Sequence, residues 1–313
     1  MSKQKKTSIG GMALMEGIMM RGPQKTMMAV RRPDGEIEVS EESFKSLASK
    51  SKFFKIPLVR GVVGFIDSML TGYKCLIKSA EIAGLELEEE EASEFDKKLM
   101  NFFGDKLMTV ISAIAMVFGV ALAVGLFFLL PSFLFDQLQK LWPGILGLRS
   151  PFEGGLRILI FVVYILAISG MKDVKKMFQY HGAEHKTIFC YEAGLELTVE
   201  NVKKQRRFHP RCGTSFLLIM MVLGIIIGFF IPFQDMYLRS AVKILLVPLM
   251  MGLGYEIIKI AGRHDNILTR IVSAPGIWMQ RLTTKEPDDD QIEVAIAALA
   301  PVIPENGEDE WGS

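Results

Sequence analysis

The sequence predicts a mainly α-helical membrane protein: a polytopic bundle of about four transmembrane helices, with a cytoplasmic metal-binding loop and a small N-terminal β-hairpin region. Two observations predict the bundle. Half of the 313 residues are hydrophobic, with a mean hydropathy of +0.30, and the apolar residues gather in long blocks. A third observation predicts the loop, because three of the four histidines lie between two of those blocks.

Two of the expected spans follow from length alone. Residues 107–130 and 213–234 contain no charged side chain. Each block exceeds the roughly 18–20 residues needed to cross the hydrocarbon core of a bilayer.

Two further spans are expected at residues 156–171 and 239–260. The first carries Arg157 near its edge, where a long side chain can extend to the interface. The second carries Pro248 in its middle, which predicts a kink. With these two, the expected number of spans is four.

Basic residues set the expected orientation. The loop 172–212 is the most basic in the chain, whereas residues 131–155 and 235–240 are poor in Lys and Arg. Cytoplasmic loops carry the excess of positive charge, so this loop and both termini are expected in the cytoplasm. Three cysteines without paired spacing also favour a reducing compartment: Cys75, Cys190 and Cys212.

Residues 1–55 are expected to form a cytoplasmic segment that is rich in Gly and Met and contains a hairpin. The hairpin is predicted over residues 26–39, with its turn at Pro33-Asp34-Gly35. Upstream, residues 8–23 contain Glu16 and Arg21. These residues are either a solvated charge pair beside a core strand or an acid–base pair that contributes to a site.

Residues 56–106 predict an amphipathic helix at the membrane interface followed by an acidic linker, Glu86 to Glu91. Residues 261–313 predict a cytoplasmic tail with one short helix at residues 291–299. Its acidic end, residues 305–313, is expected to be disordered.

The motif with the most potential metal-binding and catalytic groups is H-x-x-E-H in the loop 172–212. On a helix, His181 and His185 lie one turn apart on the same face, so both rings can approach one metal ion. Glu184 stands between them as a carboxylate able to activate water, which is the inverted zincin arrangement. This helix is expected to continue directly from the span at residues 156–171 and to end at Gly194.

A second segment completes the candidate site. His209 and Cys212 form H-x-x-C before a glycine, a spacing typical of a metal-binding turn. Imidazole and thiolate ligands together favour zinc. A pair of ordinary polar histidines is the alternative explanation for such short motifs.

Four other residues are candidates for the surroundings of the metal. Glu192 follows the two histidines along one stripe of the helix, and Glu16 and Arg21 come from the N-terminal segment. Glu256 lies in the last span, where ionisable residues are candidates for function. It shares a helix face with Lys259 and Arg263, and an interfacial salt-bridge ladder explains those two residues at least as well.

Five segments together resemble the YqhQ-like family, a family of uncharacterised bacterial inner-membrane proteins. The resemblance implies a bacterial membrane location and a metal-dependent enzyme, but no substrate. The similar segments are residues 10–23, 180–187, 197–202, 209–216 and 281–289.

Three functions are therefore considered. The first is a metal-dependent hydrolase of a peptide or lipid-linked bond, with His181, His185 and His209 as ligands and Cys212 as the fourth ligand or close by. The second is a non-enzymatic scaffold or assembly factor pinned by a closed structural zinc site. The third is a transporter, which Glu256 in a kinked helix supports. Membrane lipids are the expected partners, and no nucleic acid is expected.

Overall fold

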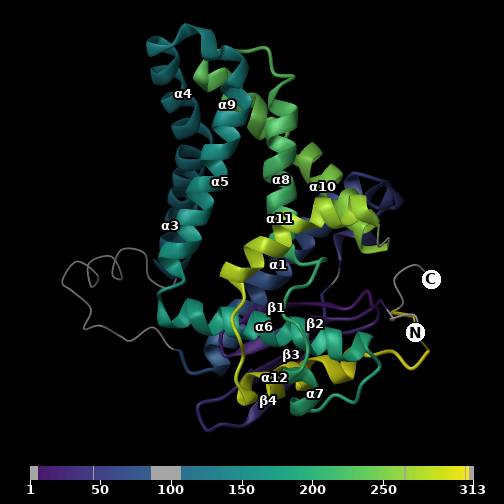
Figure 1. The fold of residues 1–313 in the computed structure, drawn as a ribbon. Coiled ribbons are helices and arrows are strands. Elements are labelled where there is room, and N and C mark those ends of the chain that lie inside the picture. Colours follow the sequence, from purple (N-terminus) through teal and green to yellow (C-terminus); the bar gives the residue numbers. More distant parts are fainter. Residues whose placement is uncertain (1–5, 45, 86–106, 264–265, 307, 310–313) are drawn as a thin grey trace, which may run out of the picture. The chain divides into compact units, whose positions relative to one another are not determined.

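The computed structural model describes residues 6–44, 46–85, 107–263, 266–306 and 308–309 (Figure 1). The acidic linker at residues 86–106 and the fourth histidine, His264, lie outside the described residues. The chain forms two compact units. The sheet unit comprises Met1–Leu85, Tyr164–Met220 and Pro248–Ser313, and the helical unit comprises Glu86–Val163 and Met221–Val247.

The sheet unit contains one antiparallel sheet whose four strands follow chain order. The predicted hairpin is confirmed as its second half, and residues 8–23 supply its first half as another hairpin, where one core strand was considered. Gly35 takes a positive φ of 91° in the predicted turn. The strands are β1 (Gly10–Leu14), β2 (Gly17–Arg21), β3 (Thr26–Arg31) and β4 (Ile37–Glu41).

Both faces of this sheet are buried, which explains the unbroken apolar runs of β2 and β3. Ile18, Met20 and Ala29 face helices α6 and α12, while Met19 and Met28 point to the opposite face. Figure 1 shows the sheet between these helices and α1. The helices are α1 (Val59–Ile82), α6 (Lys172–Glu192) and α12 (Asp289–Leu299).

The helix expected at residues 291–299 is present as α12, which begins two residues earlier, at Asp289. Asp288 and Gln291 form a reciprocal capping box at its first turn. The chain end beyond it differs from the expectation of disorder: Asp309 is buried and accepts hydrogen bonds from Thr7 Oγ1 (2.6 Å) and from the Tyr191 hydroxyl (2.9 Å). The expectation is wrong at this residue because two polar groups bind its carboxylate.

The expected continuous helix through the histidines is also wrong. Helix α5 (Arg149–Ile168) ends before Gly170, and α6 starts after Met171, whose backbone is extended at ψ 137°. Gly194 ends α6 as predicted, with a φ of 69°. The short helix α7 (Val199–Lys203) follows, capped by the Thr198 hydroxyl.

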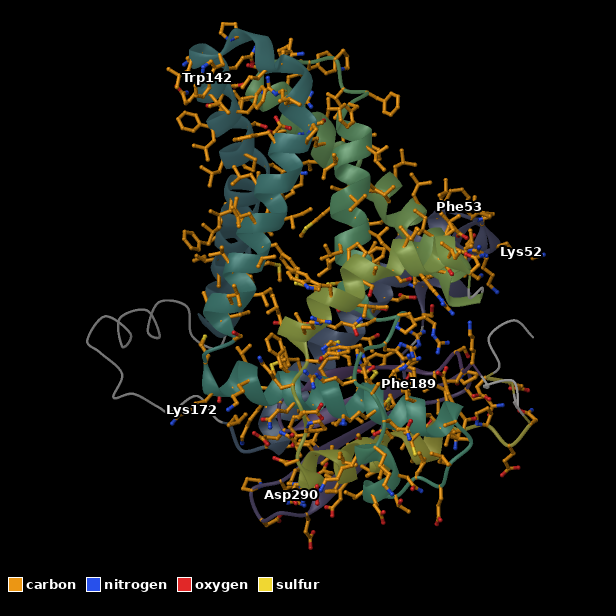
Figure 2. The ribbon with its side chains drawn as sticks, in the orientation of Figure 1. Lys52, Phe53, Trp142, Lys172, Phe189 and Asp290 are labelled. Carbon is orange, nitrogen blue, oxygen red and sulfur yellow. The ribbon has the colours of Figure 1, made fainter. Side chains whose placement is uncertain are left out.

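Two helices are long and apolar enough to cross a membrane, and a bent pair supplies a third candidate. The two helices are Ile114–Leu141 and Pro143–Ile168; the first joins α3 (Leu107–Val124) to α4 (Leu130–Leu141) through a π-helical turn, Gly125–Leu129. Large apolar side chains project outward from it, as Figure 2 shows around the labelled Trp142. The protein therefore has the helices of a membrane-associated chain.

The structure supports fewer spans than the four expected from sequence. Helix α8 (Gly213–Gly228) has 16 residues and stops short of Pro232, which restricts the backbone before it. Helices α9 (Met236–Leu245) and α10 (Val247–Arg263) meet at a 46° bend next to Pro248. Helix α11 (Ile267–Thr283) completes the described helices of the sheet unit.

The helical unit encloses an ionic cluster. Glu153 on α5 is fully buried. Its carboxylate accepts a hydrogen bond from Arg149 Nε at 3.0 Å and one from Arg239 Nε at 3.3 Å, and it contacts the Lys243 ammonium group. This cluster was not expected from the sequence, because Glu153 lies outside the apolar block at residues 156–171. Three cations around one buried carboxylate make that carboxylate essential to the packing of the unit.

Replacing Glu153 by Ala is expected to destabilise the helical unit by on the order of 3–5 kcal/mol, because the buried Arg239 and Lys243 lose their carboxylate partner and Arg149 keeps only Asp136. Thermal unfolding of the detergent-purified protein measures the change. Glu200→Ala, which removes an exposed partner of Lys204, serves as the control and should melt like the wild type. Equal melting of both variants would contradict the role given to Glu153.

Candidate metal centre

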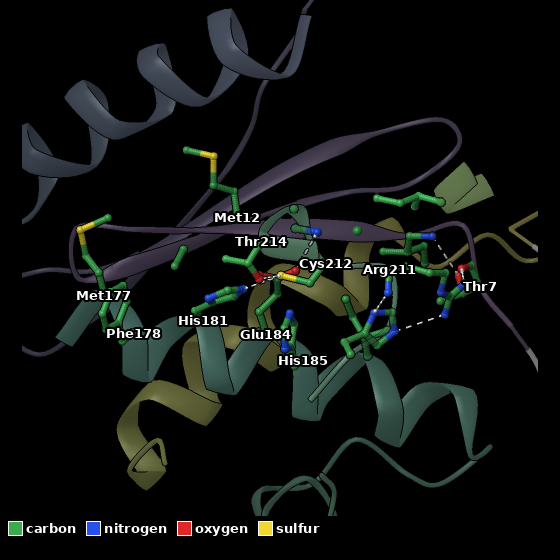
Figure 3. Close-up of a pocket in the computed structure, with 18 of the residues that line it drawn as sticks. Thr7, Met12, Met177, Phe178, His181, Glu184, His185, Arg211, Cys212 and Thr214 are labelled. Carbon is green, nitrogen blue, oxygen red and sulfur yellow. Dashed lines mark hydrogen bonds between the residues drawn. The ribbon is translucent and has the colours of Figure 1, made fainter. Parts of the chain in front are cut away.

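Helix α6 presents the three residues of the H-x-x-E-H motif on one side. Their side chains lie between α6 and strand β1 (Figure 3). The rings of His181 and His185 meet edge to face, with centroids 4.5 Å apart. The predicted helix and the predicted common face of the two histidines are thus present.

Backbone carbonyl groups fix both imidazole rings. His181 Nδ1 lies 2.9 Å from the carbonyl oxygen of Thr283, and His185 Nδ1 lies 2.5 Å from that of Arg207. A carbonyl oxygen only accepts, so each Nδ1 must carry the proton. In the neutral ring, Nε2 then keeps its lone pair, which is the arrangement found in most metal-bound histidines.

Cys212 brings a sulfur atom to the same place. Its carbonyl oxygen accepts from the backbone N–H of Ser215 at the start of α8, so the residue caps that helix. Its Sγ lies 3.1 Å from His181 Nε2 and 3.1 Å from Thr214 Oγ1. Among the described residues, His181, His185 and Cys212 each offer one ligand atom, and these atoms lie within 4.8 Å of one another.

The spacing of these atoms suits a small ion. Zinc bonds of about 2.0–2.3 Å in a tetrahedron separate neighbouring ligand atoms by roughly 3–4 Å. Closing the observed gaps to such values takes only small movements of side chains. The donor set, two imidazoles and a thiol, fits zinc better than it fits magnesium or calcium.

Gly182 allows the chain to pass close over α6. A Cβ atom at this position would come within 2.0 Å of the carbonyl oxygen of Lys285. The backbone N–H of Lys285 donates to the carbonyl of Phe178 at 2.8 Å, which ties the crossing segment down. The same segment contains Thr283, whose carbonyl oxygen orients the His181 ring. Gly182 therefore helps to position His181, because it lets this segment pass close to α6.

Gln280 on α11 fixes the second segment and was not found from sequence. Its Oε1 accepts from the His209 backbone N–H at 2.7 Å, and its Nε2 donates to the His209 carbonyl at 2.6 Å and to Ser215 Oγ at 3.2 Å. The residue is fully buried. The sequence offered one indication, a glutamine within an amphipathic helical segment. Nothing in the sequence linked that glutamine to residues 209–215.

Glu184 lies beside the cluster with its carboxylate held by strand β1. The backbone N–H of Gly11 donates to Glu184 Oε1 at 3.0 Å. Burial raises the pKa of Glu184, and the nearby rings of His185 and His181 oppose that rise. A carboxyl whose pKa moves toward neutrality is suited to both accepting and returning a proton.

His209 is buried but stands apart from the three-residue group. Its ring centroid is 5.5 Å from that of His185, and its Nε2 lies 3.2 Å from Arg211 Nη2. Burial and then the charge of Arg211 lower the pKa of His209 well below its usual range. Its assignment as a metal ligand remains a prediction from sequence.

Glu192 lies next to His209 and Arg211, outside the group formed by His181, His185 and Cys212. Its carboxylate contacts Arg211 and accepts from the Thr7 backbone N–H at 2.9 Å. It lies 4.0 Å from His209 Nε2. Glu192 therefore lies beside His209, and the Glu192 carboxylate pairs with Arg211.

The three remaining candidates lie elsewhere in the sheet unit. Glu16 accepts from Lys176 Nζ at 2.6 Å, and Glu256 forms a two-pronged ion pair with Arg60 at 2.7 and 2.5 Å. Arg21 ends β2 with an exposed side chain. None of the three is among the described residues that line the cavity at the histidines.

A cavity of about 590 Å³ opens onto the cluster. One part of its wall is polar and includes Glu184 and the three-residue group. The rest is mostly apolar; Figure 3 shows Met12, Met177 and Phe178 on the side of His181. Such a cavity accepts a ligand with one polar, reactive group and an apolar body.

The Cys212 and His181 side chains form an acid–base pair. Burial would lower the pKa of His181, but the neighbouring thiolate outweighs it and raises that pKa to about 9. Burial would raise the pKa of Cys212, but the charges of His181 and His185 outweigh it and hold that pKa well below its usual value. Without a metal, the pair therefore carries a thiolate and an imidazolium.

Comparison with known proteins establishes the family. A family model described as "Protein of unknown function (DUF1385)" matches residues 56–305. The chain belongs to this family. It is also 34% identical over 302 residues to the uncharacterized protein YqhQ of Bacillus subtilis (strain 168), covering 96% of this chain and 93% of that relative. The resemblance found from the five segments is confirmed, and no solved structure matches the chain.

In chelator-treated protein, iodoacetamide should alkylate Cys212 at pH 6.5 at least about tenfold faster than a thiol of ordinary pKa, because the thiolate persists at that pH. Cys75, whose pKa burial raises to about 11, serves as the internal control. Mass spectrometry of the modified peptides measures both rates. His181→Ala should move the reaction of Cys212 to higher pH. Modification of Cys212 only near pH 9 in the unsubstituted protein would contradict the pair.

Proposed function

We propose that the protein is a metal-dependent hydrolase of the bacterial inner membrane that acts on a peptide or lipid-linked bond. One observation carries the proposal: two oriented Nε2 atoms and a thiol sulfur converge beside a buried carboxylate, in a cavity with an apolar wall. The site faces the cytoplasm, and the metal is zinc.

The topology in this proposal is multi-pass with both termini in the cytoplasm. The excess of Lys and Arg in residues 172–212 supports this orientation, as does a site that depends on a reduced thiol. Two or three apolar helices in the structure are compatible with it. The fourth span requires α8 to cross together with the residues that follow it.

Three ligands and one open position favour catalysis over a structural role. Catalytic zinc sites keep one coordination position for water or substrate, whereas structural sites are closed by four protein ligands. In this proposal His181, His185 and Cys212 bind the ion, and His209 supports them from beside Arg211. The bound ion would polarise the bond under attack and lower the pKa of water.

Glu184 is proposed as the general base. Gly11 holds one carboxylate oxygen, which leaves the other free to take a proton from water and to pass it to the leaving group. The hydrogen bonds of Thr283 and Arg207 keep both imidazoles fixed while the proton moves. The apolar cavity wall excludes bulk water from this exchange.

A second candidate function rests on the Cys212–His181 pair. A thiolate at a helix N-terminus, 3.1 Å from an imidazole, is the arrangement of a cysteine nucleophile and its base. The sequence-based alternatives also stay open. A scaffold would close the zinc site with His209. A transporter would need Glu256 to leave its ion pair with Arg60.

Metal analysis of the detergent-purified protein, prepared under reducing and chelator-free conditions, tests the metal. Substituting each proposed ligand by Ala should lower bound zinc from about one ion per chain to well below half, because each removes a bond. His264→Ala is the control, since no His or Cys lies at chelating spacing from that residue in the sequence. His209→Ala separates the three-ligand site, which keeps its zinc, from a closed four-ligand site. Wild-type protein without stoichiometric metal would contradict the proposal.

Glu184→Gln tests the enzyme. The substitution keeps size and shape but cannot accept a proton, so it should lower the rate by on the order of 10²–10⁴ while metal content and melting temperature stay unchanged. Complementation of a deletion strain gives the readout. A scaffold predicts full complementation by this variant, and that result would count against the hydrolase. Glu192→Gln, which alters a carboxylate paired with Arg211 instead, is the comparison variant.

A further inference from the structure

We propose that the substrate is an extended apolar peptide segment, which binds in the cavity by pairing its backbone with the free edge of strand β1. The cleavage of that peptide rests on the proposed function, but its binding does not.

Strand β1 has one edge without a strand partner among the described residues, because the sheet order is β1-β2-β3-β4. Its register pairs Leu14 with Gly17 across a two-residue turn, so alternate residues of β1 bond to β2. Gly11 and Ala13 fall between these pairs, and their backbone groups point away from β2. The bond from the Gly11 N–H to Glu184 agrees with this direction.

The free edge runs along the cavity. Seven consecutive residues, 7–13, line it together with the three-residue group and Glu184. Figure 3 shows β1 passing above His181, Glu184 and His185. A chain paired with this edge would therefore place one of its peptide bonds next to the cluster. The Gly11 carbonyl and both backbone groups of Ala13 are the groups directed toward such a chain.

Glycine makes this edge accessible. Gly10 is exposed, and a Cβ atom built there would meet nothing within 4 Å. Gly11 has no side chain, and a Cβ atom at this position would come within 2.8 Å of Met19 O and Met20 Sδ and within 3.0 Å of Glu184 Cδ. A second backbone can approach closely where no side chain intervenes.

The cavity walls indicate the side chains of the peptide. Val174, Met177 and Phe178 from α6 and Ile258 from α10 are apolar, and they leave no charge on that side of the wall. Ile168, the last residue of a candidate membrane span, also lines the cavity. An apolar segment from the membrane-proximal part of another protein fits these walls.

A peptide explains the cavity better than a lipid does. An acyl chain would use the apolar wall, but it has no repeated amide groups to pair with alternate residues of β1. Addition of a strand to a sheet edge draws its affinity from main-chain hydrogen bonds and its specificity from the pockets for side chains. The edge of β1 offers the main-chain groups, and the apolar cavity walls offer the surface for side chains.

The test uses the full chain as Glu184→Gln in detergent, so that bound peptide stays intact. The probe is a pool of fluorescent nonapeptide amides built from Leu, Val, Phe and Thr, and fluorescence anisotropy measures binding. The same pool with alternate backbone nitrogens methylated should bind at least about tenfold more weakly, because each methyl group removes one main-chain donor.

Ala13→Pro should also weaken binding at least about tenfold, since it removes an outward N–H at an edge position where proline is tolerated. Val39→Pro is the matched control. The register of β3 and β4 directs the Val39 N–H outward at the opposite edge, so this variant should bind the pool like its parent. If Ala13→Pro fails to fold, the comparison of the two peptide pools still decides.

Equal binding of the methylated and unmethylated pools would overturn the proposal. So would the absence of peptide binding, whether or not fluorescent phosphatidylglycerol binds in the same cavity. If the protein binds the pool through β1 but contains no zinc, the proposed hydrolase function is wrong and the proposed peptide binding is still supported.

Discussion

Two hydrogen bonds from imidazole Nδ1 atoms to backbone carbonyls determine what the site can do. They select the tautomer of His181 and His185 and aim both Nε2 atoms at Cys212. The carbonyls come from distant parts of the chain, Thr283 at the end of α11 and Arg207 before α8. Much of the sheet unit must therefore fold before the site exists. Gly182 is part of the same constraint, because any larger residue would push the Thr283 segment away.

The sheet gives this arrangement a rigid base. Helices cover both of its faces, and the apolar side chains of β2 and β3 alternate between two buried clusters. A strand buried in this way has one register, because a shift by one residue would exchange its two faces. The fixed register also fixes the edge of β1, so that the Gly11 N–H reaches Glu184. Strand and helix thus hold the carboxylate between them.

Local pattern and spacing predicted the parts of the fold that depend on neighbours in sequence. The turn at Gly35, the short helix near the C-terminus and the common face of His181 and His185 were all visible as short motifs. Long-range contacts were not visible. Nothing in the sequence links Gln280 to the backbone of His209, or Gly11 to Glu184, because such pairs are set by tertiary packing.

The length of an apolar block gave a wrong prediction for one helix, and the presence of a charge gave a wrong expectation for Glu153. The uncharged block at residues 213–234 looked like a complete span, yet Pro232 shortens α8 to 16 residues. Glu153 looked like the end of a loop, yet it is buried among three cations. Hydropathy counts residues along the chain, whereas burial of a charge depends on which helices meet around it.

The two proposed chemistries would use the same atoms and would exclude each other. His181 Nε2 holds a proton when it pairs with the Cys212 thiolate, and it must give up that proton to bind a metal. Proton and metal would therefore compete for one lone pair, so we expect the affinity for a metal to fall as the pH falls. Glu184 acts on both sides of this competition: its carboxylate raises the pKa of His181, and it would attract a divalent ion more strongly than a proton on the ring because the ion carries the larger charge. A cysteine nucleophile has no need of that carboxylate, whereas a hydrolytic metal site depends on one.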